Sequence, residues 1–417
     1  MIAPQLRRLL VSASRGIGIT LLTLVLVDVV CISLGLFPPT LEYGNSDVGW
    51  LPLIPRKIVL DSCVDASGRW IYYYRNEIGV RTNRTMAELT RDRGTFMIAD
   101  VGDSQSDICA ANELNHPGVL EAGLNARGVH TVVLPYAVGR YSPLQAYLLY
   151  ETRLKQYHPD ALLVNFYTGN DFNDLLRIDD RPFFVRSGRG YEIHKPVWYR
   201  YDDPDSSHRS RVLFVLRSIL TKTGLRNLFQ RVSFLWQMAA EEGKGVGAVF
   251  AYMRDLRRSV EPTVGYQAAF TAQILNQQLF FHHFPKSKAE SVRRTRALME
   301  MITKRNPGVL LIMSPLPSYQ LARGAAVDDS YRKVLGRLPL TLEEGVREEE
   351  ELYYILRDLA GELGWLFIDN LGPLRRYDGP EKLYNDFDYH LTPTASAIIG
   401  DVEAEALTLP IKERRTN

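Results

Sequence analysis

The sequence has little cysteine, almost no net charge and no repeated or low-complexity tract. Three cysteines in 417 residues are too few for a disulfide framework. A formal net charge of +2 excludes the global basic field of a nucleic-acid-binding protein, so no DNA or RNA partner is expected. The contents of 46% hydrophobic and 24% charged residues are ordinary for a globular protein whose length allows a sizeable core.

One long apolar run stands apart at the N-terminus. Residues 16–37, GIGITLLTLVLVDVVCISLGLF, carry one charge, at Asp28. A helix of this length spans about 33 Å, enough to cross a bilayer core. Because no small-x-small cleavage site follows, we expect an uncleaved transmembrane anchor, with a cleaved signal peptide as the alternative. Arginines precede the run and acids follow it, which predicts that residues 1–15 are cytoplasmic and that residues 40–417 are periplasmic or extracellular.

A lead-in follows the apolar run. Residues 40–93 are rich in Gly, Pro, Asn and Tyr and predict an irregular segment with short strands, one of them in WIYYYRNEIGVRTN (70–83). Cys63 in this lead-in and Cys109 beyond it could join in an exported domain. Two cysteines are a weak case for a disulfide, however, and we expect free buried thiols.

From residue 94 strand-like and helix-like stretches alternate. TFMIADVG (95–102), HTVVLPYAV (130–138) and DALLVNFYTGND (160–171) are typical of strands, and helical stretches at 107–126 and 142–157 separate them. This order predicts right-handed crossovers and a central parallel sheet with helices on both faces.

The alternation breaks at about residue 172 and resumes after 290. Residues 172–290 hold charged loops and helical stretches, which predicts a helical cap inserted into one α/β domain built from 94–171 and 291–417. Within the cap, the basic and apolar stretch 211–240 fits an amphipathic helix packed on its own domain. A helix lying on a membrane surface is the less favoured alternative.

Polar residues lie where the predicted strands end. GDSQS (102–106) follows the first strand, AVGRYSPLQ (137–145) the second and YTGND (167–171) the third, while NDFDYHLTP (385–393) precedes the closing helix. Open α/β sheets carry their chemistry at the carboxyl ends of the strands. We therefore expect these four segments to converge.

The converging segments resemble the SGNH (GDSL) esterase and lipase superfamily, whose name gives the residue types Ser, Gly, Asn and His in that order. The resemblance covers roughly residues 94–171 and 306–400. In addition, NEIGVRT (76–82) is similar to the lead-in of membrane-anchored bacterial members. The resemblance implies a flavodoxin-like three-layer α/β/α fold and no metal or organic cofactor.

The same resemblance assigns a role to each polar residue. It implies that Ser104 is the nucleophile, that His390 is the general base and that Asp388 orients His390. It further implies that Gly139 and Asn170, with the amide of Ser104, form the oxyanion hole. A serine needs such a base, imidazole titrates near neutrality, and each oxyanion donor is worth roughly 3 kcal/mol.

Alternatives stay open at two of these positions. The oxyanion amide can come from Arg140 instead of its neighbour Gly139, because a backbone N–H serves from either residue. Asp386 is the alternative to Asp388.

Four further residues have a less direct part. Asp103 and Asp171 are interpreted as supporting residues that hold their own turns, because few His or Cys ligands for a metal lie nearby. His282 and His283 lie in the predicted cap, where cap packing or a substrate contact is expected.

The sequence thus predicts a membrane-anchored, extracytoplasmic serine esterase that hydrolyses O-acyl or O-acetyl esters of a carbohydrate or lipid through an acyl-enzyme. An O-acyltransferase acting on a cell-envelope polysaccharide is the nearest alternative, because the same acyl-enzyme can pass its group to a sugar hydroxyl. A non-catalytic binding or scaffold protein with the same fold is the alternative from another functional class.

Overall fold

The computed structural model describes residues 42–45, 48–52, 57–65, 68–90, 94–177, 182–188, 190–195, 234–259, 276–386 and 388–416. The predicted anchor at 16–37 and residues 211–233 of the predicted amphipathic stretch lie outside this set. Among the described residues, no helix has the length and apolar character needed to cross a bilayer.

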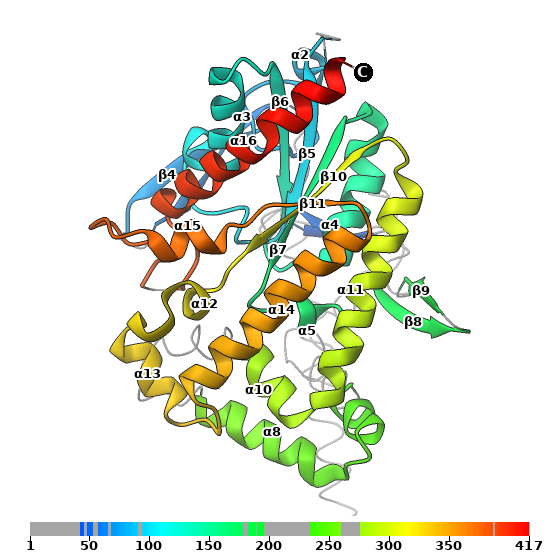
Figure 1. Cartoon of the computed structure of the whole chain (residues 1–417), viewed down its shortest axis with the longest axis vertical. Coiled ribbons are helices and arrows are strands. Elements are labelled where there is room, and N and C mark those ends of the chain that lie inside the picture. The colour runs from blue at the N-terminus through cyan, green and yellow to red at the C-terminus, as the bar shows by residue number, and fades with distance from the viewer. Residues whose placement is uncertain are drawn as a thin grey trace, which may run out of the picture.

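A five-stranded parallel sheet lies at the centre of the molecule (Figure 1). Its strands are β5 (Phe96–Gly102), β6 (Thr131–Ala137), β7 (Ala161–Tyr167), β10 (Leu310–Leu316) and β11 (Leu366–Phe367). They lie in the order β11-β10-β7-β5-β6, and every pairing is parallel. The sequence order therefore reverses between β5 and β7, which is where open α/β sheets form a crevice.

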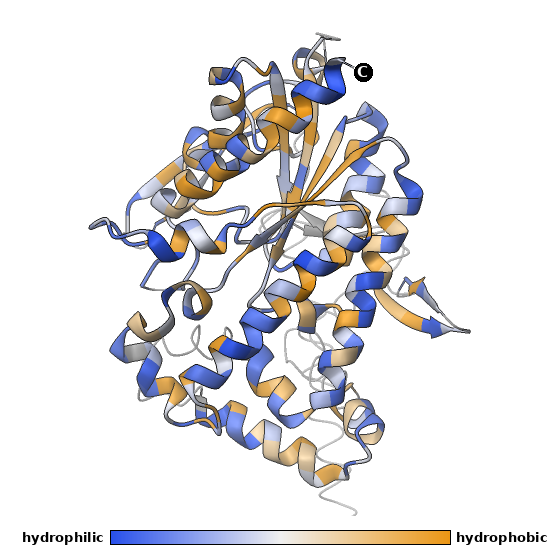
Figure 2. Cartoon of the chain, viewed as in Figure 1, coloured by the Kyte–Doolittle hydropathy of each residue, from blue (hydrophilic) through white to orange (hydrophobic). Residues whose placement is uncertain are grey.

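Helices cover both faces of this sheet, as the sequence predicts. They are α3 (His116–Ala126), α4 (Pro143–Leu149), α11 (Pro285–Arg305), α14 (Leu342–Glu362) and α16 (Pro393–Thr416). On β5, Phe96 and Ile98 belong to the core under α3 and α16, whereas Met97 and Ala99 belong to the core under α4, α11 and α14. Figure 2 shows hydrophobic residues concentrated on the strands, as expected when both faces are buried. The predicted parallel sheet with flanking helices is confirmed.

Shorter elements connect these layers. The helical ones are α2 (Met86–Leu89), η1 (Asn112–Leu114), the π-helix η2 (Tyr150–Leu154), η3 (Lys155–Tyr157), α5 (Asp171–Asp174), α12 (Tyr319–Arg323), η7 (Gly324–Ala326), α13 (Asp329–Leu335) and α15 (Leu371–Arg376). Two antiparallel hairpins precede the sheet, formed by β1 (Glu42–Asn45) with β2 (Gly49–Pro52) and by β3 (Val59–Val64) with β4 (Trp70–Arg75).

The segment predicted to be a helical cap contains both helices and strands in its described part. A hairpin of β8 (Phe183–Ser187) and β9 (Gly190–His194) comes first. Helical residues 234–241, α8 (Val246–Ser259) and α10 (Asn276–His283) follow. The sequence pattern does not indicate the hairpin.

The helix expected to start at residue 107 begins nine residues later, at His116. Asn115 caps it, since its side chain accepts a hydrogen bond from the backbone N–H of His116, and Pro117 occupies the first turn. The residues before it form a loop and η1 instead.

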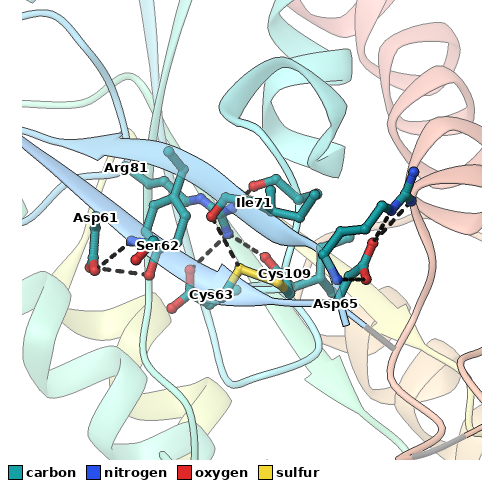
Figure 3. Close-up of a disulfide and its surroundings, with 12 residues drawn as sticks. Asp61, Ser62, Cys63, Asp65, Ile71, Arg81 and Cys109 are labelled. Atoms are coloured by element: carbon teal, nitrogen blue, oxygen red, sulfur yellow. Dashed lines mark hydrogen bonds and ion pairs between the residues drawn. A yellow bond between two sulfur atoms is a disulfide. The ribbon is translucent and has the colours of Figure 1, made fainter. Parts of the chain in front are cut away.

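In that loop, Cys109 forms a disulfide bond with Cys63 of β3 (Figure 3). The two Cα atoms are 5.8 Å apart, within the range that a disulfide bridges. The prediction of free thiols is wrong. The bond joins the lead-in hairpin to the segment that follows Ser104.

Candidate active site

The first strand of the sheet ends in a tight corner that presents Ser104. At Gly102, a Cβ would lie 2.9 Å from the Cβ of Asn165 on the neighbouring strand, so the close approach requires glycine. After the strand, Asp103 closes the turn: its Oδ1 accepts a hydrogen bond from the N–H of Gln105 at 2.9 Å. The side chain of Asp103 thus holds its own turn, and the hydroxyl of the half-buried Ser104 stands at the sheet edge.

The structure brings His390 and Asp388 to this hydroxyl. His390 Nε2 lies 2.9 Å from Ser104 Oγ, although the two residues are 286 positions apart. On the other side of the ring, Nδ1 lies 2.8 Å from Oδ2 of Asp388. Asp388 Oδ1 also accepts the backbone N–H of His390 at 3.0 Å. Asp386 instead pairs with Lys382, so Asp388 is the acid beside the imidazole.

The electrostatics of the three groups depend on burial and on one another. Burial of the ring opposes its protonation, but the adjacent Asp388 carboxylate and the charge of Asp103 outweigh burial and raise the pKa of His390. Burial also disfavours the Asp388 carboxylate, yet the hydrogen bonds and charge of His390 hold the pKa of Asp388 below its usual range. Asp103 lies deeper, where burial raises its pKa to about 6.

The loop that carries His390 is held at both ends. Ahead of it, Tyr389 adopts a left-handed backbone with φ +53°, and its N–H donates to the carbonyl of Asn385. Behind it, Thr392 Oγ1 accepts the N–H of Ala395 in the first turn of α16 and so caps that helix. His390 therefore lies directly before a rigid helix.

Asn170 and Gly139 lie at the same edge. A Cβ at Gly139 would lie 3.5 Å from the Cβ of Ser104, so this corner lies against Ser104. The next residue, Arg140, has a left-handed backbone with φ +69°. Asn170 follows β7, and its Nδ2 donates to Oδ2 of the buried Asp174 at 3.0 Å. An amide nitrogen carries two N–H groups, so one remains to point elsewhere.

Asp171 and Asp174 hold the turn after β7. Asp171 Oδ2 accepts the N–H of Tyr167 at 2.7 Å, which fixes the end of the strand. Asp174 also lies 3.0 Å from Nη1 of Arg177. Asp174 is not among the site residues predicted from the sequence, although its position four residues after Asn170 is the spacing at which helical side chains meet.

The two neighbouring histidines of the predicted cap lie on α10 and have no part in this geometry. His283 Nε2 is 3.1 Å from Oδ2 of Asp255 on α8, so this ring joins two helices of the inserted segment. Burial lowers the pKa of His283. Within the part of the chain that the structure describes, no group of three or more His, Cys, Asp and Glu side chains could hold a metal ion.

The lead-in braces the loop after Ser104. Arg81 Nη1 donates to Oδ1 of Asp107 at 2.9 Å and to the carbonyl of Ile108 at 2.6 Å. Arg75 Nη2 donates to the other carboxylate oxygen of Asp107 at 2.7 Å. Together with the disulfide between Cys63 and Cys109, these contacts attach the β3–β4 hairpin and the segment 76–82 that follows it to the loop after Ser104. This mechanical role of NEIGVRT is not predicted from the sequence.

No protein-family model matches the chain, and no curated protein matches it. The functional assignment therefore depends on the site itself.

Proposed function

We propose that the protein is an SGNH-type serine hydrolase with a flavodoxin-like α/β/α fold, which cleaves O-acyl or O-acetyl esters through an acyl-enzyme on Ser104. The observation that carries this proposal is the 2.9 Å contact between Ser104 Oγ and His390 Nε2, with Asp388 2.8 Å from the other ring nitrogen. A hydroxyl, an imidazole and a carboxylate in this chain of contacts are the groups that nucleophilic catalysis by serine requires.

In the first step, neutral His390 accepts the Ser104 proton while Oγ attacks the ester carbonyl carbon. The imidazolium that forms is stabilised by the Asp388 carboxylate. Negative charge develops on the former carbonyl oxygen. The free N–H of Asn170, the amide of Ser104 and an amide of the Gly139–Arg140 corner are the donors proposed for that oxygen.

In the second step the tetrahedral adduct collapses. The bond to the leaving alkoxide breaks, His390 returns its proton to that oxygen, and the acyl group stays on Ser104. A water molecule then loses a proton to His390 and attacks the acyl carbon. The bond from that carbon to Ser104 Oγ breaks, the acid leaves, and His390 returns its proton to Oγ, which regenerates the hydroxyl. A sugar hydroxyl in place of the water would make the same chain an O-acyltransferase.

The cellular location proposed for the protein rests on the sequence alone. We propose that residues 16–37 anchor it in a membrane, with the N-terminus cytoplasmic and the catalytic domain outside the cytoplasm. Acylated envelope carbohydrate and lipid are the substrate classes found there.

Labelling with a fluorophosphonate probe tests the nucleophile. Wild-type protein should be labelled, and Ser104→Ala should not. Ser106→Ala is the matched control: this serine lies two residues away in the same loop, its buried Oγ has no hydrogen-bond partner in the described part of the chain, and labelling should persist. Folded wild-type protein that takes no label would contradict the proposal and favour a non-catalytic scaffold.

A second experiment distinguishes water from a sugar hydroxyl as the acceptor of the acyl group. The enzyme is incubated with an acyl donor, with and without an oligosaccharide. Free acid as the product in both reactions indicates an esterase. Acylated sugar in the second reaction indicates a transferase.

A further inference from the structure

The hairpin of β3 and β4 turns an apolar face toward solvent. Its antiparallel register pairs Val64 with Trp70 and Leu60 with Tyr74, which places these side chains and that of Tyr72 on one face. All five are exposed, by between 43% and 62%. Ser62, which pairs with Tyr72, is the polar residue on this face. Single exposed apolar residues are normal, whereas five gathered on one face of a hairpin mark a contact surface.

The opposite face of the same hairpin is firmly attached to the domain. Cys63 forms the disulfide with Cys109, and Arg75 donates to Asp107 at 2.7 Å (Figure 3 shows the disulfide). Within the hairpin, Tyr73 of β4 donates its hydroxyl proton to Oδ2 of Asp61 on β3 at 3.1 Å, which ties the two strands together. Because the inward residues are held by covalent and ionic bonds, the outer row is displayed rigidly.

The composition of the outer row suits the boundary of a lipid bilayer. Trp70, Tyr72 and Tyr74 combine a large apolar ring with a polar N–H or O–H, and such side chains gather where hydrocarbon meets water. Leu60 and Val64 opposite them are purely aliphatic, so they gain by entering the acyl-chain region.

Chain length places this row near the predicted anchor. The apolar run ends at residue 37, and β3 begins at Val59. Residues 42–52 fold back on themselves, since Glu42 pairs with Pro52, and therefore add only the spacing of two strands. Residues 38–41 and 53–58 supply the remaining reach, which is at most about 35 Å for ten extended residues. The hairpin thus lies within roughly 40 Å of the end of the anchor once a strand spacing of about 5 Å is added.

We propose that the outer face of the β3–β4 hairpin, formed by Leu60, Val64, Trp70, Tyr72 and Tyr74, rests on the surface of the membrane in which residues 16–37 are inserted. This inference rests on the membrane anchor of the proposed function. Since the inner face of the hairpin is bonded to the loop that follows Ser104, the contact fixes the orientation of the catalytic site relative to the bilayer. Such a rigid second contact would favour the hydrolysis of acyl esters at the membrane surface over that of esters free in solution.

Lipid quenching of a single fluorophore in the full chain tests this contact. Cys31→Ser removes the thiol in the apolar run, and Tyr72→Cys then provides the labelling site for bimane. Leu409→Cys is the matched control, because this apolar side chain is 63% exposed on α16. Both proteins are reconstituted into nanodiscs with ordinary or brominated phosphatidylcholine. We expect brominated lipid to quench the probe at 72 several-fold more than the probe at 409.

The failure of the anchor and the failure of the hairpin contact give different results. Release of the full chain from membranes by alkaline carbonate would contradict the anchor and the inference together. Stable insertion with a probe at 72 that is as accessible to aqueous iodide as the control would overturn the hairpin contact alone. Shielding that appears in detergent and rises with protein concentration would instead assign the row to a second copy of the chain and overturn the membrane contact.

A second variant gives a catalytic readout. The triple change Trp70→Ser, Tyr72→Ser and Tyr74→Ser should leave the rate on a short soluble ester unchanged, because these side chains face away from the site. The rate on an ester embedded in vesicles should fall at least tenfold. Equal rates of wild type and triple variant on both substrates would count against the inference.

Discussion

Gln105 Oε1 accepts a hydrogen bond from the backbone N–H of Leu391 at 3.1 Å, which joins the residue after Ser104 to the residue after His390. Gln105 is buried, so no water replaces this bond when it is lost. The contact fixes the distance between the loop that carries Ser104 and the loop that carries His390.

Gln105→Ala is therefore expected to slow the reaction while the protein stays folded. It leaves the buried N–H of Leu391 unsatisfied, which costs about 1–3 kcal/mol, and it loosens the approach of His390 to Ser104. We expect the rate of fluorophosphonate labelling to fall about tenfold and the melting temperature to decrease by a few degrees. Gln156→Ala, on a distant part of the chain, is the control. An unchanged labelling rate would show that the two loops do not need this bond.

The pH dependence of the reaction should reflect His390. The base must be neutral to accept a proton, so activity rises with pH through the pKa of His390, which Asp388 and Asp103 hold above the ordinary value. Asp388→Asn removes the main group that raises this pKa. The inflection should move to lower pH, and the plateau rate should drop by about four orders of magnitude. Asp386→Asn should change neither, and an identical profile for Asp388→Asn would remove Asp388 from the mechanism.

Asn170→Ala tests the oxyanion hole. The change removes a donor that acts on the transition state, so kcat should fall by about 10²–10³ with little change in KM. Asp174→Asn should have a smaller effect, about tenfold on kcat, because it only weakens the hydrogen bond that orients the Asn170 amide. A loss of kcat in Asp174→Asn as large as that in Asn170→Ala would contradict this division of roles.

The disulfide should contribute mainly to stability. Cys63 and Cys109 are 46 residues apart, and closing a loop of this size restricts the unfolded chain by about 4 kcal/mol. Replacing both with serine should lower the free energy of unfolding by that order, as measured by urea titration of the oxidised wild type against the variant. Labelling of Ser104 should persist, because Arg81 and Arg75 still hold Asp107. Equal stability of the two proteins would show that the covalent bond adds nothing.

Local sequence patterns were sufficient to predict the elements whose conformation is decided by neighbouring residues. Buried strands such as Phe96–Gly102 and Ala161–Tyr167 are largely apolar runs that end in turn residues, each with one polar residue, Asp100 or Asn165, inside it. The sheet and the positions of Ser104 and Asn170 at its edge therefore follow from the sequence. The expected helix at 107–126 starts late because Asn115 and Pro117 favour a helix start, and the preceding loop is held by Cys109.

The sequence by itself therefore determined which residue types stand at the ends of the strands, because strand periodicity, turn chemistry and helix capping act over a few residues. Only the tertiary structure decided that Asp388 and not Asp386 faces His390, that Gln105 meets Leu391, that the cysteines pair and that an apolar row of β3 and β4 faces outward. Those outcomes depend on side-chain direction and on contacts between segments up to 286 residues apart, which no local pattern encodes.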